Sequence, residues 1–166
     1  YPPHGRIPNF AGADAAADRL ADTDAWRSAD AIKSNPDAPQ LPVRRAALRA
    51  GKTVYMAVPR LRDEECFLRL DPAAIDDIDH ATTIGGSAEV GVQVRPEAMP
   101  PIDLIVAGSV AVTEAGARVG KGEGYSDLEY GVLQAFDLVG ESTTVATTVH
   151  ERQVVAEHAP VDAHHV

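Results

Sequence analysis

The residues of this sequence whose types and spacing could do chemistry lie in the stretch Gly120-Lys121-Gly122-Glu123-Gly124-Tyr125-Ser126-Asp127. Glycines at alternate positions allow positive φ and close approach, so the backbone amides of the loop can line an anion site. Lys121 supplies a cation, and Asp127 supplies a carboxylate that could hold Mg²⁺. A nucleoside triphosphate requires these groups, so the stretch predicts a phosphate site; the alternative is a plain glycine turn that enters a helix.

The residues around this stretch predict a strand, a loop and a helix. Residues 102–108 (IDLIVAG) form a near-continuous apolar run, which is typical of a strand buried on both faces, and we expect 109–113 to extend it. A helix is expected over about 125–139. Its predicted apolar stripe consists of Leu128, Val132, Leu133, Phe136 and Val139. Ligands of parallel sheets bind at the carboxyl ends of strands, and this strand-loop-helix unit puts the glycines there.

Elsewhere the chain alternates between helical and strand patterns. Helices are expected over 11–22, around Trp26 and over 40–50; strands are expected over 29–34, 53–58, 66–70, 143–149 and within 88–94. In the helix over 40–50 we expect Arg44, Arg45 and Arg49 to point outward. The alternation predicts a single α/β domain over 1–166, a three-layer α/β/α arrangement with a largely parallel sheet.

Composition narrows the classes of function. The formal net charge is −10, with only three lysines among 15 basic residues. Such a field repels nucleic acid. Lysine depletion with excess aspartate favours a halophilic protein over an ordinary acidic one. We expect no membrane span, because no apolar run is long enough. The single Cys66 excludes an intrachain disulfide and fits a reducing cytoplasm.

The run IDLIVAGSVAV…GARVGKGEGYSDLEYGVL resembles the 5-formyltetrahydrofolate cyclo-ligase (methenyltetrahydrofolate synthetase) family. In that family an apolar strand precedes the motif R-x-G-[KR]-G-x-G-Y-[YS]-D and a helix. Other segments agree in order: Gly51-Lys52, Pro59-Arg60 after the TVYMAV strand, and HERQ at 150–153. The segments GRIPNF and SNPDAPQ resemble an archaeal and eukaryotic branch of the family.

The resemblance implies a NagB/RpiA/CoA-transferase-like fold and ATP-dependent ring closure. The formyl oxygen of 5-formyltetrahydrofolate attacks the γ-phosphate of MgATP, and a folate nitrogen displaces phosphate to give 5,10-methenyltetrahydrofolate. Such chemistry needs positioning and charge neutralisation rather than covalent catalysis by the protein. The implied partners are ATP, Mg²⁺ and a folate substrate, with no nucleic acid and no membrane. The implied oligomeric state is a monomer or homodimer.

By motif position, the resemblance assigns a role to each candidate residue. Lys121 and Arg60 are catalytic, Asp127 binds Mg²⁺, and Asp37 and Met56 bind substrate. The residues that contact the nucleotide are Arg118, Gly120, Lys121, Gly122, Glu123, Gly124 and Tyr125.

Five of these assignments have a structural alternative. Arg60 and Arg118 could form surface salt bridges, Tyr125 could pack in the core, and Asp127 could be an ordinary acid in the first turn of a helix. Asp37 could be a turn residue after a proline.

The sequence also departs from the family pattern. Glu123 stands where several members carry lysine, Ser126 replaces a tyrosine, and the aromatic W-x-I-x-Q-P segment expected near 85–95 is absent. The family continues beyond both Tyr1 and Val166, so we expect residues missing at both ends. The departures favour one competing function, a nucleotide-binding or regulatory homologue without cyclo-ligase activity. A second competitor is a sugar-phosphate isomerase or acyltransferase, which the glycine loop disfavours because an isomerase needs no nucleotide site.

Overall fold

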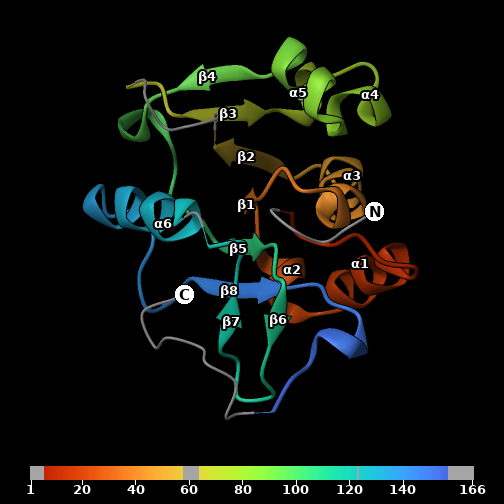
Figure 1. The fold of residues 1–166 in the computed structure, drawn as a ribbon. Coiled ribbons are helices and arrows are strands. Elements are labelled where there is room, and N and C mark those ends of the chain that lie inside the picture. Colours follow the sequence, from red (N-terminus) through yellow and green to blue (C-terminus); the bar gives the residue numbers. More distant parts are fainter. Residues whose placement is uncertain (1–5, 58–63, 123, 157–166) are drawn as a thin grey trace.

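The computed structural model describes residues 6–57, 64–122 and 124–156 (Figure 1). Its centre is a six-stranded sheet in the order β4-β3-β2-β1-β5-β8. The parallel strands are β1 (Ala31–Ser34), β2 (Thr53–Ala57), β5 (Leu104–Ala107) and β8 (Thr144–Thr147). β3 (Phe67–Leu70) and β4 (Val92–Val94) continue the sheet in antiparallel fashion. The predicted α/β class with a largely parallel sheet is confirmed.

Helices cover both faces of the sheet (Figure 1). One layer contains α1 (Ala13–Ala21), α2 (Asp24–Ser28), α3 (Leu41–Arg49) and α4 (Ile78–Thr82), and α5 (Ile84–Val90) follows α4. α6 (Tyr125–Ala135) lies on the opposite face. Short 3₁₀ helices span Ala38–Gln40, Pro72–Ala74, Pro96–Ala98 and Glu151–Gln153. No described helix is long and apolar enough to cross a membrane.

Two apolar clusters, one on each face, separate the three layers. Side chains alternate along a strand, so neighbouring residues join different clusters. Ile32, Val54 and Leu104 pack with α1, α2 and α3. Tyr55 and Ile105 pack on the other face, together with residues of β3 and Leu133 of α6. The alternation explains why the central strands are apolar almost throughout.

The predicted extension of β5 through residues 109–113 is wrong. The strand ends at Ala107, and the chain enters a separate hairpin of β6 (Ala111–Val112) and β7 (Arg118–Val119). Gly108 stands at the departure, where an added Cβ would lie 2.9 Å from both Asp37 Oδ2 and Gln40 Oε1. A side chain at this position would therefore have to displace the ends of the Asp37 and Gln40 side chains.

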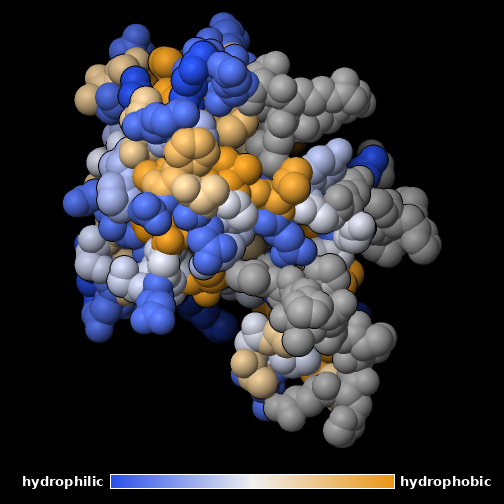
Figure 2. Space-filling model, turned by 90° about the vertical axis from the view of Figure 1, so that its left-hand side faces the viewer, coloured by the Kyte–Doolittle hydropathy of each residue, from blue (hydrophilic) through white to orange (hydrophobic). Residues whose placement is uncertain are grey.

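The predicted apolar stripe of α6 is confirmed only in part: Val132, Leu133 and Val139 pack in the cluster on that face of the sheet, whereas Leu128 and Phe136 do not. The helix ends at Ala135 rather than near 139, and Leu128 and Phe136 are 56% and 42% exposed. The buried side chains of α6 are Glu129 and Leu133. Apolar side chains therefore remain at the surface on the side of the molecule that carries α6, where Figure 2 shows a hydrophobic area. The sequence period predicts that apolar side chains line one side of a helix, but packing against the sheet determines which side is buried.

Two further expectations need correction. Arg44 of α3 is 1% exposed rather than outward, because its guanidinium donates to the backbone carbonyls of Asn35 after β1 and of Thr82 at the end of α4. Residues 84–90 form a helix, and the strand expected within 88–94 is limited to Val92–Val94. The Thr83 hydroxyl accepts a hydrogen bond from Gly86 N and starts that helix, which the glycine-rich sequence did not indicate.

Candidate functional site

The glycine stretch lies between the hairpin that follows β5 and the start of α6. Gly122 and Gly124 have φ of 84° and 72°, the left-handed region that favours glycine. Gly124 immediately precedes α6, and no side chain caps the helix there. The amide groups at a helix start attract anions through their dipoles. The local backbone therefore has the form that the sequence predicted for a phosphate loop.

Residues 118–122 and 124–127 line a small pocket of about 60 Å³. Its lining comprises Arg118, Val119, Gly120, Lys121, Gly122, Gly124, Tyr125, Ser126 and Asp127. Most of the predicted nucleotide-binding residues thus share one pocket. Tyr125 is 41% exposed, so it is not the core-packing residue of the alternative interpretation.

Lys121 and Asp37 meet although they are far apart in sequence. Lys121 Nζ lies 3.6 Å from Asp37 Oδ1, and the side chains are 34% and 14% exposed. Asp37 begins the 3₁₀ helix after β1, but its carboxylate makes no capping hydrogen bond there. The carboxylate instead faces Lys121 and Gly108. The predicted phosphate loop and the predicted substrate carboxylate therefore both lie at the carboxyl ends of the parallel strands.

Arg118 lies inside the protein rather than in a surface salt bridge. It is 6% exposed; its Nη2 donates to Gly108 O and its Nε to Ser109 Oγ. Burial lowers the pKa of Arg118, and the negative charges of Asp127, Asp37 and Glu129 oppose that shift. Arg118 thus places a positive charge beside the pocket while fixing the end of β5. An added Cβ on Gly120 would lie 3.2 Å from Arg118 Nη2, so this glycine leaves room for the guanidinium.

Asp127 supplies one half-buried carboxylate at the pocket. Among the described residues, no group of three His, Cys, Asp or Glu could hold a metal ion. This donor set does not suit an ion held by protein ligands alone. It does suit Mg²⁺, which commonly takes one or two carboxylates and completes its shell with phosphate oxygens and water. Asp127 could hold the metal of a nucleotide complex.

Of the remaining candidates, the structure describes Met56 alone. Met56 lies within the apolar cluster beneath α3 and is 2% exposed, so its assignment to substrate binding stays a prediction. Arg60 and Glu123 lie outside the described residues.

A partly buried polar network supports the carboxyl ends of the parallel strands, and the sequence did not single it out. Ser109 Oγ lies 2.7 Å from Thr147 Oγ1, and Gln153 Nε2 donates to Ser109 O at 2.9 Å. Gln40 is fully buried, and its Oε1 has no protein partner. The HERQ segment could have indicated this network. Its glutamine, Gln153, connects the chain after β8 to the turn after β5 by hydrogen bonds.

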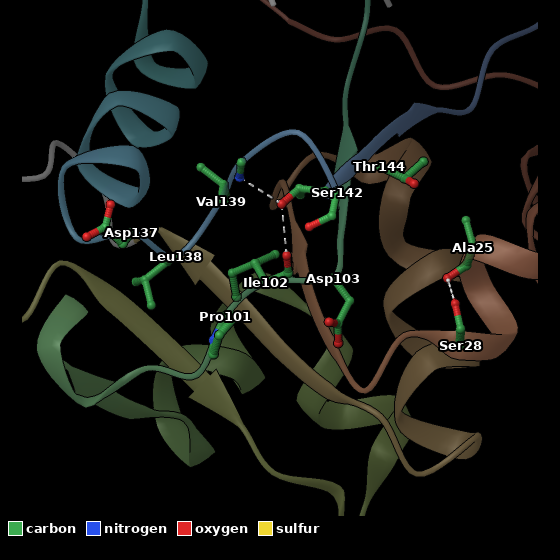
Figure 3. Close-up of a pocket in the computed structure, with 12 residues that line it drawn as sticks. Ala25, Ser28, Pro101, Ile102, Asp103, Asp137, Leu138, Val139, Ser142 and Thr144 are labelled. Carbon is green, nitrogen blue, oxygen red and sulfur yellow. Dashed lines mark hydrogen bonds between the residues drawn. The ribbon is translucent and has the colours of Figure 1, made fainter.

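A larger pocket opens at the opposite ends of the strands (Figure 3). It measures about 400 Å³ and lies at the amino ends of β5 and β8. Its lining includes Asp103 and Asp137 but neither lysine nor arginine. Asp103 Oδ2 already accepts hydrogen bonds from Asp30 N and Ala31 N. Because the pocket offers acids without cations, it does not suit a phosphate ligand.

Comparison with known proteins identifies the family. A model of the 5-formyltetrahydrofolate cyclo-ligase family matches residues 3–166. The chain belongs to this family. Membership confirms the resemblance carried by the glycine motif, and it places the chain in a family of ligase-type enzymes.

Curated relatives agree with this assignment. The chain is 43% identical over 157 residues to a methenyltetrahydrofolate synthase domain-containing protein of Mus musculus. Proteins of the same name from Bos taurus and Homo sapiens are 42% and 39% identical. These matches cover 93% of this chain but only 41–42% of each relative. The chain therefore spans about two fifths of the length of these relatives.

Proposed function

We propose that this domain binds MgATP in the glycine loop and converts 5-formyltetrahydrofolate to 5,10-methenyltetrahydrofolate. The observation that carries the proposal is the meeting of Lys121 and Asp37, which belong to the nucleotide and substrate parts of the family pattern. Phosphoryl transfer requires both ligands side by side. A cytoplasmic protein acting as a monomer or homodimer is part of the same proposal.

The proposed roles follow from the charges and hydrogen-bonding groups of the site. Lys121 and Arg118 balance the charge of the triphosphate, and the loop amides bind its oxygens. Asp37 accepts paired hydrogen bonds from the aminopyrimidine edge of the pterin and so orients the formyl group. Bound MgATP supplies the phosphoryl group that activates the formyl oxygen. Phosphate then leaves as the neighbouring folate nitrogen closes the ring.

A turnover and binding experiment tests this function. With MgATP and 5-formyltetrahydrofolate in molar KCl, the protein should form the methenyl product, detected by its near-ultraviolet absorbance, with one ADP per product. Lys121→Ala should weaken MgATP binding by roughly 1.5–3 kcal/mol in calorimetry, because a charge-assisted contact is lost. Asp127→Asn should weaken binding mainly when Mg²⁺ is present. The exposed Glu141→Gln is the control and should behave as wild type.

The competing function is a nucleotide-binding homologue without cyclo-ligase activity. The absent aromatic segment near 85–95 favours it, because folate then lacks one expected contact. MgATP binding without any methenyl product would support this competitor and reject ring closure. Unchanged MgATP affinity in both Lys121→Ala and Asp127→Asn would reject the glycine loop as the nucleotide site.

A further inference from the structure

The helix that follows the glycine loop is anchored to the sheet by an unusual pair of side chains. α6 buries Leu133 and Glu129, which lie four residues apart and therefore on the same side of the helix. Leu133 joins the apolar cluster on that face of the sheet. Glu129 is the anchor nearer to the glycine loop. The start of α6 is thus held by a buried carboxylate rather than by an apolar side chain.

The partner of Glu129 is Lys33 in the central strand β1. Lys33 Nζ lies 2.9 Å from Glu129 Oε1, and the two side chains are 3% and 7% exposed. Lys33 Nζ also donates to Asn35 Oδ1 at 2.9 Å. Because side chains alternate along β1, Lys33 faces α6 whereas Ile32 faces the opposite helices. Lysine is rare in this chain, which makes a fully buried one notable.

Stability alone does not account for this pair. Removing two charges from water costs free energy that their attraction repays poorly, and a packed apolar pair often stabilises a protein as well or better. What an ion pair adds is a defined geometry, since only one arrangement of the helix brings the two charges into contact. Glu129 lies one turn after Tyr125, so fixing Glu129 also fixes the end of the glycine loop.

The contacts of Lys33 continue to the turn that carries Asp37. Asn35, which receives the lysine, offers its backbone oxygen to Arg44 Nη1 at 2.7 Å. The same Nη1 donates to Asp37 O at 3.0 Å. A series of polar contacts therefore runs from α6 through β1 to Asp37, and all but the partly buried last one are buried. The start of α6 and the turn that carries Asp37 are therefore both connected to the end of β1.

We propose that Lys33 and Glu129 are positioning residues that hold the glycine loop in register with the Asp37 turn. This inference rests on the proposed function, in which the loop binds a nucleoside triphosphate and Asp37 binds a heterocycle with an aminopyrimidine edge. In this role the pair acts on the ligands only through the segments that it holds. It sets the distance between them by fixing α6 against β1, which phosphoryl transfer requires to fractions of an ångström.

The test separates positioning from stability by exchanging the charges for apolar groups. Lys33→Met and Glu129→Leu each leave one buried charge unpaired, so each should lower the melting temperature. The double variant Lys33→Met/Glu129→Leu should recover a melting temperature near wild type. Its affinity for MgATP should nevertheless fall about tenfold in calorimetry, as found when groups that orient a site are removed. Backbone amides of residues 118–128 should exchange hydrogen faster without any ligand.

Lys52→Met is the matched control. Lys52 is also buried, and its Nζ donates to Ala29 O at 2.6 Å, but it precedes β2 at the opposite edge of the sheet. This variant should lose stability while keeping wild-type MgATP affinity and wild-type exchange in residues 118–128.

The outcomes for the two proposals are distinguishable. A stable double variant with wild-type exchange in residues 118–128 and wild-type MgATP affinity would overturn the positioning role. Equal losses of MgATP affinity in the double variant and in Lys52→Met would also overturn it, because a loss of stability alone would then explain both. If the wild-type protein binds no MgATP, the proposed function fails, whereas faster exchange of the loop in the double variant alone would still support the positioning role.

Discussion

Two buried arginines donate hydrogen bonds to the backbone carbonyls just beyond the ends of β1 and β5 at the candidate site. Arg118 donates to the carbonyl of Gly108 after β5, and Arg44 donates to Asn35 O and Asp37 O after β1. Backbone carbonyls beyond a strand end lack sheet partners and need donors when buried. Burial lowers the pKa of Arg44 to about 10, partly opposed by the charge of Asp37, so the side chain stays charged at neutral pH.

Replacing Arg44 should therefore destabilise the protein. Arg44→Met should lower the free energy of unfolding by roughly 3 kcal/mol, because the buried carbonyls of Asn35 and Thr82 lose their donors. Arg49→Met should change it by less than about 0.5 kcal/mol, because that exposed residue only pairs with Asp79 at the surface. Urea denaturation at constant salt measures both. Equal losses would contradict the role assigned to Arg44.

At the scale of elements, α6 owes its place to contacts with the sheet more than to its own sequence. It contains Gly131 in its interior and begins at a glycine without a side-chain cap. Glycine weakens a helix interior because the unfolded chain has more freedom to lose. The buried contacts of Glu129 and Leu133 must offset that cost, which connects the order of the glycine loop to packing on β1.

Gly131→Ala should stabilise the protein by about 0.5–1 kcal/mol through helix propensity. An added Cβ there meets nothing within 4 Å. Gly86→Ala in α5 is the contrasting variant: its Cβ would lie 1.7 Å from His80 O, so it should destabilise. Thermal denaturation of both variants checks the prediction. A less stable Gly131→Ala would show that the space beside α6 is occupied in the folded protein.

At the scale of the whole molecule, charge is the dominant feature. A net charge of −10 on 166 residues places many carboxylates at the surface, and their mutual repulsion opposes the compact state. The same field acts against a triphosphate that approaches the site, so Lys121 and Arg118 must provide local attraction. Salt should weaken the repulsion more than the contacts inside the pocket, because buried pairs are screened less.

The melting temperature should rise clearly between low and molar KCl. The Debye length falls from about 30 Å at 0.01 M to about 3 Å at 1 M, which removes repulsion between surface carboxylates. KCl is preferred to sulfate, since sulfate also stabilises proteins by exclusion from their surface. Sorbitol at matched osmolality is the uncharged control. A melting temperature independent of KCl would contradict the halophilic interpretation.

The sequence by itself determined the features that depend on local pattern. The near-continuous apolar run over 102–108 predicted β5, and the strand segments over 29–34, 53–58, 66–70 and 143–149 predicted β1, β2, β3 and β8. The three alternate glycines predicted a loop with positive φ, which the structure confirms at Gly122 and Gly124 but not at Gly120. The same motif indicated the family of the chain, because its combination of residue types and spacing is specific.

Only the tertiary structure decided which residues meet. The contacts of Lys121 with Asp37 and of Lys33 with Glu129 join segments about 90 residues apart, and no local period encodes such pairs. The same reason explains the errors at Arg44 and along α6. A helical pattern indicates that one side is buried, but a charged side chain can be buried wherever the neighbouring loops offer it partners. For Arg44 those partners come together only once α3 lies beside the end of β1 and the end of α4.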